Sequence, residues 1–100
     1  MALYISTWDS SPVEEAVRQR WARTSRAAPG TVSWRVLHNP LQTTPQTMVL
    51  HEFESLEAAQ QWLASPERAA MTAEARQLGR TSISQQVWNT IPAQPGPLQP

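Results

Sequence analysis

The sequence predicts an α+β domain in which helices pack against a sheet, and one run of residues carries most of this prediction. Residues 47–53, Thr-Met-Val-Leu-His-Glu-Phe, are rich in β-branched and apolar residues and are typical of a strand. Two helix-start signals follow, at Ser55 and at Ser65, each with a glutamate in the first turn. Gly79 is the residue type expected just beyond the end of the second helix.

The residues before this run predict a strand, a helix and another strand. Residues 2–8 mix β-branched and aromatic side chains and stop at a polar Asp-Ser-Ser-Pro sequence, so we expect the first strand there. Ser11 is the expected N-cap of a helix that begins at Pro12 and runs to about Ser25. Residues 31–38 then predict a second strand, joined to the strand at residues 47–53 by a turn-rich loop.

The remaining residues complete the order β-α-β-β-α-β. Residues 81–91 alternate well enough for a last strand, and four prolines among residues 92–100 exclude regular structure there. This order is typical of the ferredoxin-like arrangement, a four-stranded antiparallel sheet with helices on one face. We therefore expect one domain over residues 1–91 and a Pro-rich C-terminal tail over residues 92–100.

Alternation along the two strands of the expected hairpin predicts apolar side chains on both faces of the sheet. With Trp34 opposite Leu50 and Val36 opposite Met48, one set of side chains points away from the helices. That set is Ser33, Arg35, Leu37, Val49, His51 and Phe53. Because helices cover only one face, the apolar members need another surface, and we expect a homodimer formed through the sheet face.

The composition excludes several classes of function. One hundred residues, 40% of them hydrophobic, are enough for one domain. Eight arginines balance eight acidic residues, so we expect neither nucleic acid nor an anionic membrane as a partner. The absence of cysteine excludes a disulfide framework and a thiol nucleophile. No apolar run is long enough to cross a bilayer and no signal-like segment opens the chain, so we expect a cytoplasmic protein.

Three stretches carry a resemblance to a known family. They are Pro-Gly-Thr-Val-Ser-Trp-Arg-Val-Leu at residues 29–37, Val-Leu-His-Glu-Phe-Glu-Ser-Leu-Glu-Ala-Ala-Gln-Gln-Trp-Leu at residues 49–63, and Ser-Pro-Glu-Arg at residues 65–68. The chain resembles the antibiotic-biosynthesis-monooxygenase family of dimeric α+β barrels. The resemblance implies a dimer whose sheets pack together, with a pocket in each subunit between the sheet and the helices.

The resemblance implies a cofactor-independent monooxygenase acting on an apolar aromatic substrate, because members of this family include cofactor-free oxygenases of polycyclic phenols. Trp62 matches a helical tryptophan of the heme-degrading members, but their histidine ligand falls here at Met71 or Thr72, so we expect no cofactor. The phenol-oxidising members carry an asparagine where this chain has Ala58. The alternative is therefore a non-catalytic dimeric member that binds a small ligand or has only a structural role.

The candidate substrate pocket is rich in tryptophan. We expect it to be lined by Trp8, Trp21, Trp34, Trp62, Met71 and Thr72. Aromatic walls suit a flat apolar ligand, although they equally suit a small core that must fill its volume with few residues.

The candidate catalytic pair is His51 and Arg35, which the expected register places on one strand face. His51 would be a general base beside a substrate phenol, helped by Arg35. The alternative is that both belong to a polar patch of the dimer interface. His38 would fall on the opposite face from His51, so we expect no metal site.

Overall fold

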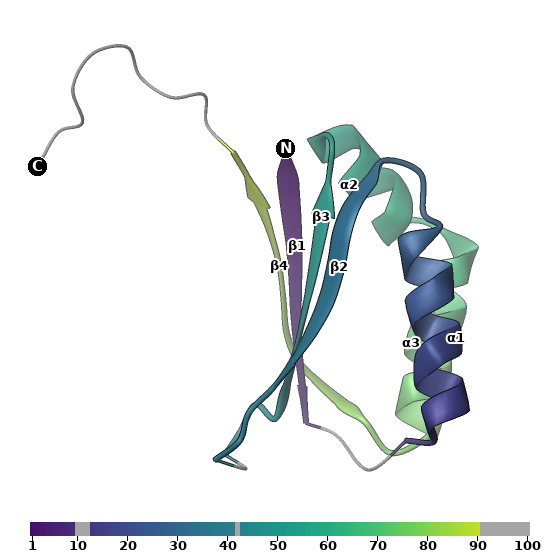
Figure 1. Cartoon of the computed structure of the whole chain (residues 1–100), viewed down its shortest axis with the longest axis vertical. Coiled ribbons are helices and arrows are strands. Elements are labelled where there is room, and N and C mark those ends of the chain that lie inside the picture. The colour runs from purple at the N-terminus through teal and green to yellow at the C-terminus, as the bar shows by residue number, and fades with distance from the viewer. Residues whose placement is uncertain (10–12, 42, 91–100) are drawn as a thin grey trace, which may run out of the picture.

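The computed structural model describes residues 1–9, 13–41 and 43–90, and it confirms the predicted fold class (Figure 1). The elements in chain order are β1 (Ala2–Asp9), α1 (Glu15–Arg26), β2 (Thr31–His38), β3 (Thr47–Phe53), α2 (Leu56–Leu63), α3 (Pro66–Gln77) and β4 (Thr81–Asn89). The helical segment predicted to break at Ser65 is two helices, α2 and α3, so the predicted β-α-β-β-α-β order holds. None of these helices is long and apolar enough to cross a membrane.

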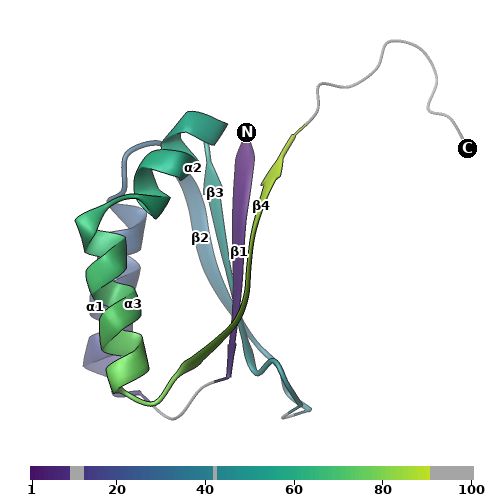
Figure 2. The same cartoon turned by 180° about the vertical axis from the view of Figure 1, so that it is seen from behind.

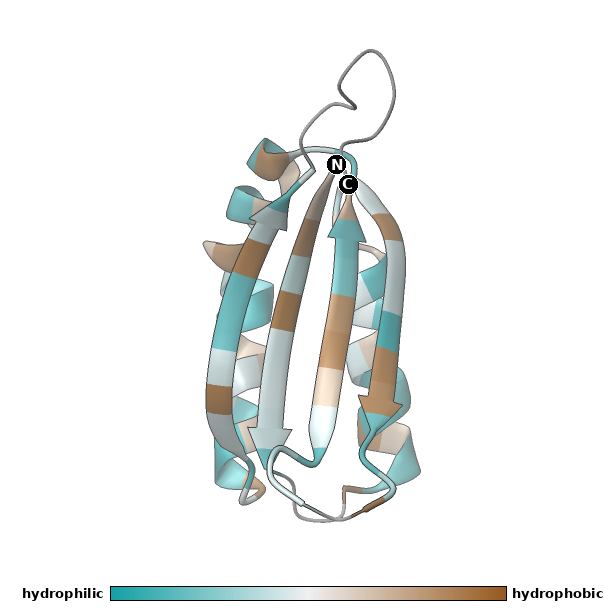
Figure 3. Cartoon of the chain, turned by 90° about the vertical axis from the view of Figure 1, so that its left-hand side faces the viewer, coloured by the Kyte–Doolittle hydropathy of each residue, from teal (hydrophilic) through white to brown (hydrophobic). Residues whose placement is uncertain are grey.

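The four strands form one antiparallel sheet in the order β2-β3-β1-β4. The helices all lie on one side of this sheet, as Figure 1 and the reverse view in Figure 2 show. Seen from its other side, the sheet stands in front of the helices, and none of the helices covers this face (Figure 3). The fold therefore has one helix-covered face and one open face.

Serine caps and a glycine set the boundaries of the second half of the chain, as predicted. The Ser55 side chain accepts a hydrogen bond from the backbone N–H of Ala58 at 3.1 Å, and Ser65 accepts one from Arg68 at 3.2 Å. Gly79 follows α3 with a φ of +89°, in the left-handed region that glycine adopts at little cost.

Two predicted boundaries fall partly outside the described residues. Helix α1 begins at Glu15, with Glu14 as an N-cap that makes no side-chain bond, rather than at Pro12. The expected cap Ser11 and Pro12 itself lie outside the described residues, as do Ile91 and the Pro-rich tail over residues 92–100.

The register between β2 and β3 differs from the expected one by one residue. Trp34 pairs with His51, and Arg35 pairs with Leu50. Because side chains alternate along a strand, a shift of one residue moves a whole set of side chains to the other face. His51 therefore points toward the helices and Arg35 lies on the open face, so the expectation that they share a face is wrong.

The connection between these strands explains the difference. It spans residues 39–46 and is closed by a hydrogen bond from the Asn39 N–H to the Gln46 carbonyl at 2.8 Å. A tight two-residue turn would have fixed the register from the sequence, whereas a longer loop does not. Burial of side chains sets the register instead. Phe53, which is 0% exposed, and His51, which is 1% exposed, both lie on the helix-covered face.

The open face remains apolar, but with different residues from those expected. Of the three large apolar side chains predicted there, Leu37 is present at 45% exposure, whereas Val49 and Phe53 face the helices. The strand pairings give the open face its own apolar set, namely Leu3, Ile5, Leu37, Met48, Leu50 and Trp88.

The core lies between the sheet and the helices in two clusters. One cluster is Ala2, Tyr4, Ala28, Phe53, Ala59 and Trp62. The other is Trp8, Trp21 and Ala75. Met71 of α3 packs against both clusters, so the space between them is bordered by aromatic rings on either side.

Candidate functional site

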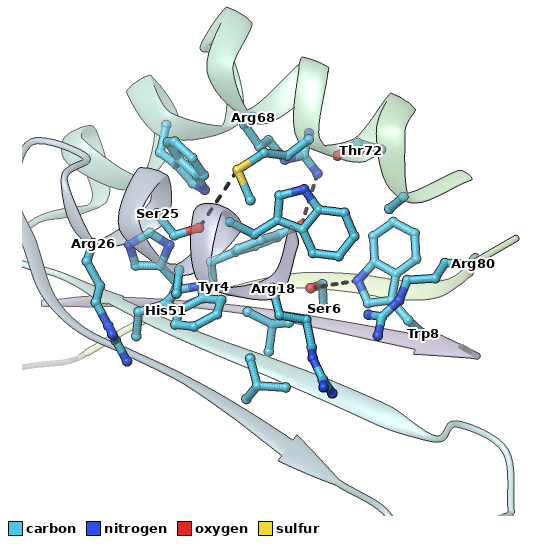
Figure 4. A pocket seen from close by; sticks show the side chains of 18 of the residues that line it. Tyr4, Ser6, Trp8, Arg18, Ser25, Arg26, His51, Arg68, Thr72 and Arg80 are labelled. Atoms are coloured by element: carbon cyan, nitrogen blue, oxygen red, sulfur yellow. Dashed lines mark hydrogen bonds between the residues drawn. The ribbon is translucent and has the colours of Figure 1, made fainter. Parts of the chain in front are cut away.

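A pocket of about 490 Å³ lies between the helix-covered face of the sheet and the helices (Figure 4). Its wall contains side chains from β1, β2, β3 and all three helices. The six residues expected to line a substrate pocket, Trp8, Trp21, Trp34, Trp62, Met71 and Thr72, all lie in this wall. Their contact with a substrate stays a prediction.

Hydrogen bonds fix two of the four indole rings. Trp8 Nε1 donates to Ser6 Oγ at 3.1 Å, and Trp21 Nε1 donates to Glu74 Oε1 at 2.7 Å. A satisfied N–H leaves the apolar ring face as the surface that the pocket presents. Trp34 has the Arg26 guanidinium 5.4 Å above its ring centroid, within the range of a cation–π contact.

His51 lies in the pocket wall among aromatic rings. Its ring stacks on Phe53 with centroids 4.0 Å apart and meets Trp62 at an interplanar angle of 61° and a distance of 5.6 Å. Its Nε2 is 2.9 Å from Thr31 Oγ1. An imidazole that is 1% exposed and has one polar partner is held firmly in place.

The hydrogen bonds around Thr31 indicate which nitrogen of His51 carries the proton. The Thr31 hydroxyl has a single proton and donates it to the Ser25 carbonyl at 3.3 Å. In that arrangement Thr31 Oγ1 accepts from His51 Nε2–H, and Nδ1 keeps a lone pair.

Burial lowers the pKa of His51 to about 4, because a charged imidazolium loses its hydration among these rings. The ring is therefore neutral at neutral pH. A neutral imidazole can accept a hydrogen bond or a proton from a ligand, which is the form that a general base requires.

Arginines form a second feature of the pocket, and the sequence did not reveal it. Four of them, Arg18, Arg26, Arg68 and Arg80, line the wall beside one acidic residue, Glu15. Arg68 donates to Tyr4 Oη at 2.9 Å and to Gln85 Oε1 at 2.8 Å. The sequence did hold one signal for Arg68. It lies three and four residues before the predicted pocket residues Met71 and Thr72, a spacing that puts all three on one face of a helix.

The positions of the two histidines also differ from the expectation. His38 pairs with Thr47, so it lies on the same face as His51, four positions further along the sheet. Four residues of strand span roughly 13 Å, which is too far for a shared ligand. Among the described residues, no three His, Asp or Glu side chains lie close enough to hold a metal ion.

Several solved structures have the same fold. The chain is 19% identical to SnoaB, a cofactor-independent oxygenase from Streptomyces nogalater, with a TM-score of 0.73 over 95% of this chain and 97% of that one. A Deinococcus radiodurans protein assigned to the antibiotic biosynthesis monooxygenases is 19% identical, with a TM-score of 0.71 over 93% and 95% of the two chains. HapK from Hahella chejuensis is 12% identical, with a TM-score of 0.68 over 97% and 99%.

The sequence comparison gives the family. No curated protein sequence matches the chain. The family model described as antibiotic biosynthesis monooxygenase matches residues 7–74, a span that runs from β1 into α3 and contains most of the pocket wall. The chain therefore belongs to the antibiotic biosynthesis monooxygenase family.

Proposed function

We propose that the protein is a cofactor-independent monooxygenase that oxidises a flat, apolar phenol in this pocket. The observation that carries the proposal is the pocket wall itself, which combines four tryptophans with a buried, neutral His51. Family membership supports it, as does the similarity in fold to a cofactor-independent oxygenase.

The proposed reaction converts a methylene group of an anthrone-like phenol into a carbonyl. In this reaction R₂CH₂ and O₂ give R₂C=O and H₂O, so one oxygen atom enters the product and the other leaves as water. All the electrons come from the substrate. Removal of a substrate proton creates the electron-rich anion that reacts with O₂, and the protein binds the ring, orients it and accepts that proton.

His51 is the proposed proton acceptor, through Nδ1. Its pKa of about 4 makes it a weak base for a phenol whose ordinary pKa is about 10. A substrate anion formed beside the ring stabilises the imidazolium, and this raises the pKa of His51 in the complex. The kcat/KM of the free enzyme should therefore stay level as the pH falls to about 5, because His51 remains neutral there.

Turnover of 1,8-dihydroxyanthrone in air tests the proposal. We expect His51→Ala to lower kcat by about 100-fold or more, the usual contribution of a positioned base. His38→Ala and Arg35→Gln are matched controls, since His38 is exposed and Arg35 lies on the open face. A His51→Ala protein that is folded and fully active would contradict the assigned role.

A non-catalytic ligand-binding member is the second candidate. The low pKa of His51 favours it, and so does Ala58, which replaces the asparagine of the phenol-oxidising members and is not part of the pocket wall. Saturable binding of the anthrone without oxygen uptake would favour this candidate over the oxygenase.

We also propose a homodimer formed through the open sheet face. Burying a large apolar side chain there contributes roughly 1.5–3 kcal/mol before association costs. Leu37→Glu should lower the dimer mass measured by light scattering toward that of the monomer. Leu41→Glu is the control, because Leu41 is 78% exposed in the loop outside the sheet. A concentration-independent mass near 11.2 kDa for the unmodified protein would contradict the dimer.

A further inference from the structure

The charge in the pocket wall is unbalanced although the chain as a whole is neutral. The wall holds four of the eight arginines and one of the eight acidic residues, which leaves a formal charge of four minus one, or +3. A solvated surface would carry both signs. A concave apolar wall with one sign of charge attracts a ligand of the opposite sign.

Arg80 is the least satisfied of these arginines. It follows Gly79, and its backbone N–H donates to the Ala75 carbonyl at 3.0 Å, so the turn between α3 and β4 holds it at the pocket. Its Nε is buried and has no hydrogen-bond partner. The guanidinium lies 5.6 Å above the ring centroid of Trp21. A buried donor without an acceptor is costly, and no acceptor in the described part of the chain offsets that cost.

Arg18 adds a second positive charge to the same part of the wall. Arg18 and Arg80 line the same pocket, and burial, followed by repulsion from Arg18, lowers the pKa of Arg80. Arg18 bonds to Glu15 at 2.8 Å, but both side chains are more than half exposed, so this pair is weak. Figure 4 labels Arg18 and Arg80 among the side chains that line the pocket.

An ion pair with Asp9 is the structural alternative for Arg80. Asp9 pairs with Thr81 across the sheet, and Asp9 Oδ1 is also buried without a hydrogen-bond partner. However, the ion pairs among the described residues are Arg18–Glu15 and Arg20–Glu74. Among the described residues, no carboxylate lies within ion-pair distance of Arg80.

We propose that the ligand of the pocket is an aromatic carboxylate, whose carboxylate binds Arg80 and Arg18 while its ring system lies along the tryptophans toward His51. The inference rests on the proposed function for the aromatic part of the ligand. The planar guanidinium fork matches the two oxygens of a carboxylate, and the indole faces match a flat ring.

Two isosteric probes test the charge preference, anthracene-2-carboxylate and anthracene-2-carboxamide. Their dissociation constants are measured by fluorescence titration of the full-length protein at pH 7.5 and low salt. We expect the carboxylate to bind about 10-fold to 100-fold more tightly than the carboxamide, the range for a hydrogen bond to a charged group. Added NaCl should reduce this preference.

Variants of Arg80 test whether this side chain causes the preference for the carboxylate probe. Arg80→Gln should remove most of the preference while the carboxamide affinity stays unchanged, and Arg80→Lys should restore part of it. Arg76→Gln is the matched control, because Arg76 is an exposed arginine of α3 outside the pocket wall. If Arg80→Gln lowers the melting temperature and leaves the preference intact, Arg80 is a structural partner of Asp9 and the inference is wrong.

The outcomes separate this inference from the proposed function. Equal binding of the two probes, or no binding of either, overturns the inference. If the protein oxidises a neutral phenol but shows no carboxylate preference, the proposed oxygenase function holds and the proposed anionic ligand is wrong. If the protein prefers the carboxylate but oxidises no phenol, the inference about the ligand holds and the proposed oxygenase function is wrong.

Discussion

Lowering the pH from about 6.5 to about 4 is expected to destabilise the protein through His51 by on the order of 3 kcal/mol. The pKa of this ring is about 4 in the folded protein and about 6.5 when unfolded. Between these values the unfolded chain binds a proton that the folded protein does not. The free energy of unfolding therefore falls as the pH decreases through this window and is constant above it.

Urea unfolding at a series of pH values from 4 to 7.5 measures this effect. The difference in slope between the unmodified protein and His51→Gln isolates the histidine, since the carboxylates titrate in both. His38→Gln is the control, because His38 is exposed and should leave the slope unchanged. Parallel curves for the unmodified protein and His51→Gln would show that the ring is not buried as described.

Replacing Gly30 by alanine is expected to cost about 2–4 kcal/mol in the free energy of unfolding. Gly30 has a φ of +80°, which strains any residue with a Cβ, and that Cβ would lie 2.6 Å from the Cβ of Ala58. The carbonyl of Gly30 also accepts from the Glu54 N–H at 2.8 Å, so the backbone cannot move aside without losing this bond.

A double-mutant cycle separates the two sources of this cost. Ala58→Gly removes the close contact but not the backbone strain, so Gly30→Ala should cost less in that background, by about 1–2 kcal/mol. Urea unfolding of the four proteins gives the coupling energy. Additive effects would show that α2 does not press against the turn at Gly30.

The sequence predicted the elements well because their signals are local. The caps at Ser55 and Ser65 and the glycine at position 79 define their helices through neighbouring backbone groups, and all three hold in the structure. The register of β2 against β3 is not local. It depends on which strand face buries Phe53 and His51, and the loop over residues 39–46 left both choices open.

The pocket was predictable to the extent that large aromatic side chains must be buried somewhere. Four of the five tryptophans gather between the sheet and the helices, whereas Trp88 lies on the open face. The arginines were not predictable in the same way. A long charged side chain can extend into solvent or fold over an apolar surface, and the position of Arg80 over Trp21 depends on the turn that precedes β4.

In the proposed function, this pocket directs molecular oxygen onto a bound phenol without a cofactor. Incubation of the chelator-treated protein with 1,8-dihydroxyanthrone under ¹⁸O₂, followed by mass spectrometry of the product, tests it most directly. We expect one ¹⁸O atom in each product molecule, formed at a rate that depends on the protein and falls in His51→Ala. A product that contains no ¹⁸O, or that forms no faster than without the protein, would contradict it.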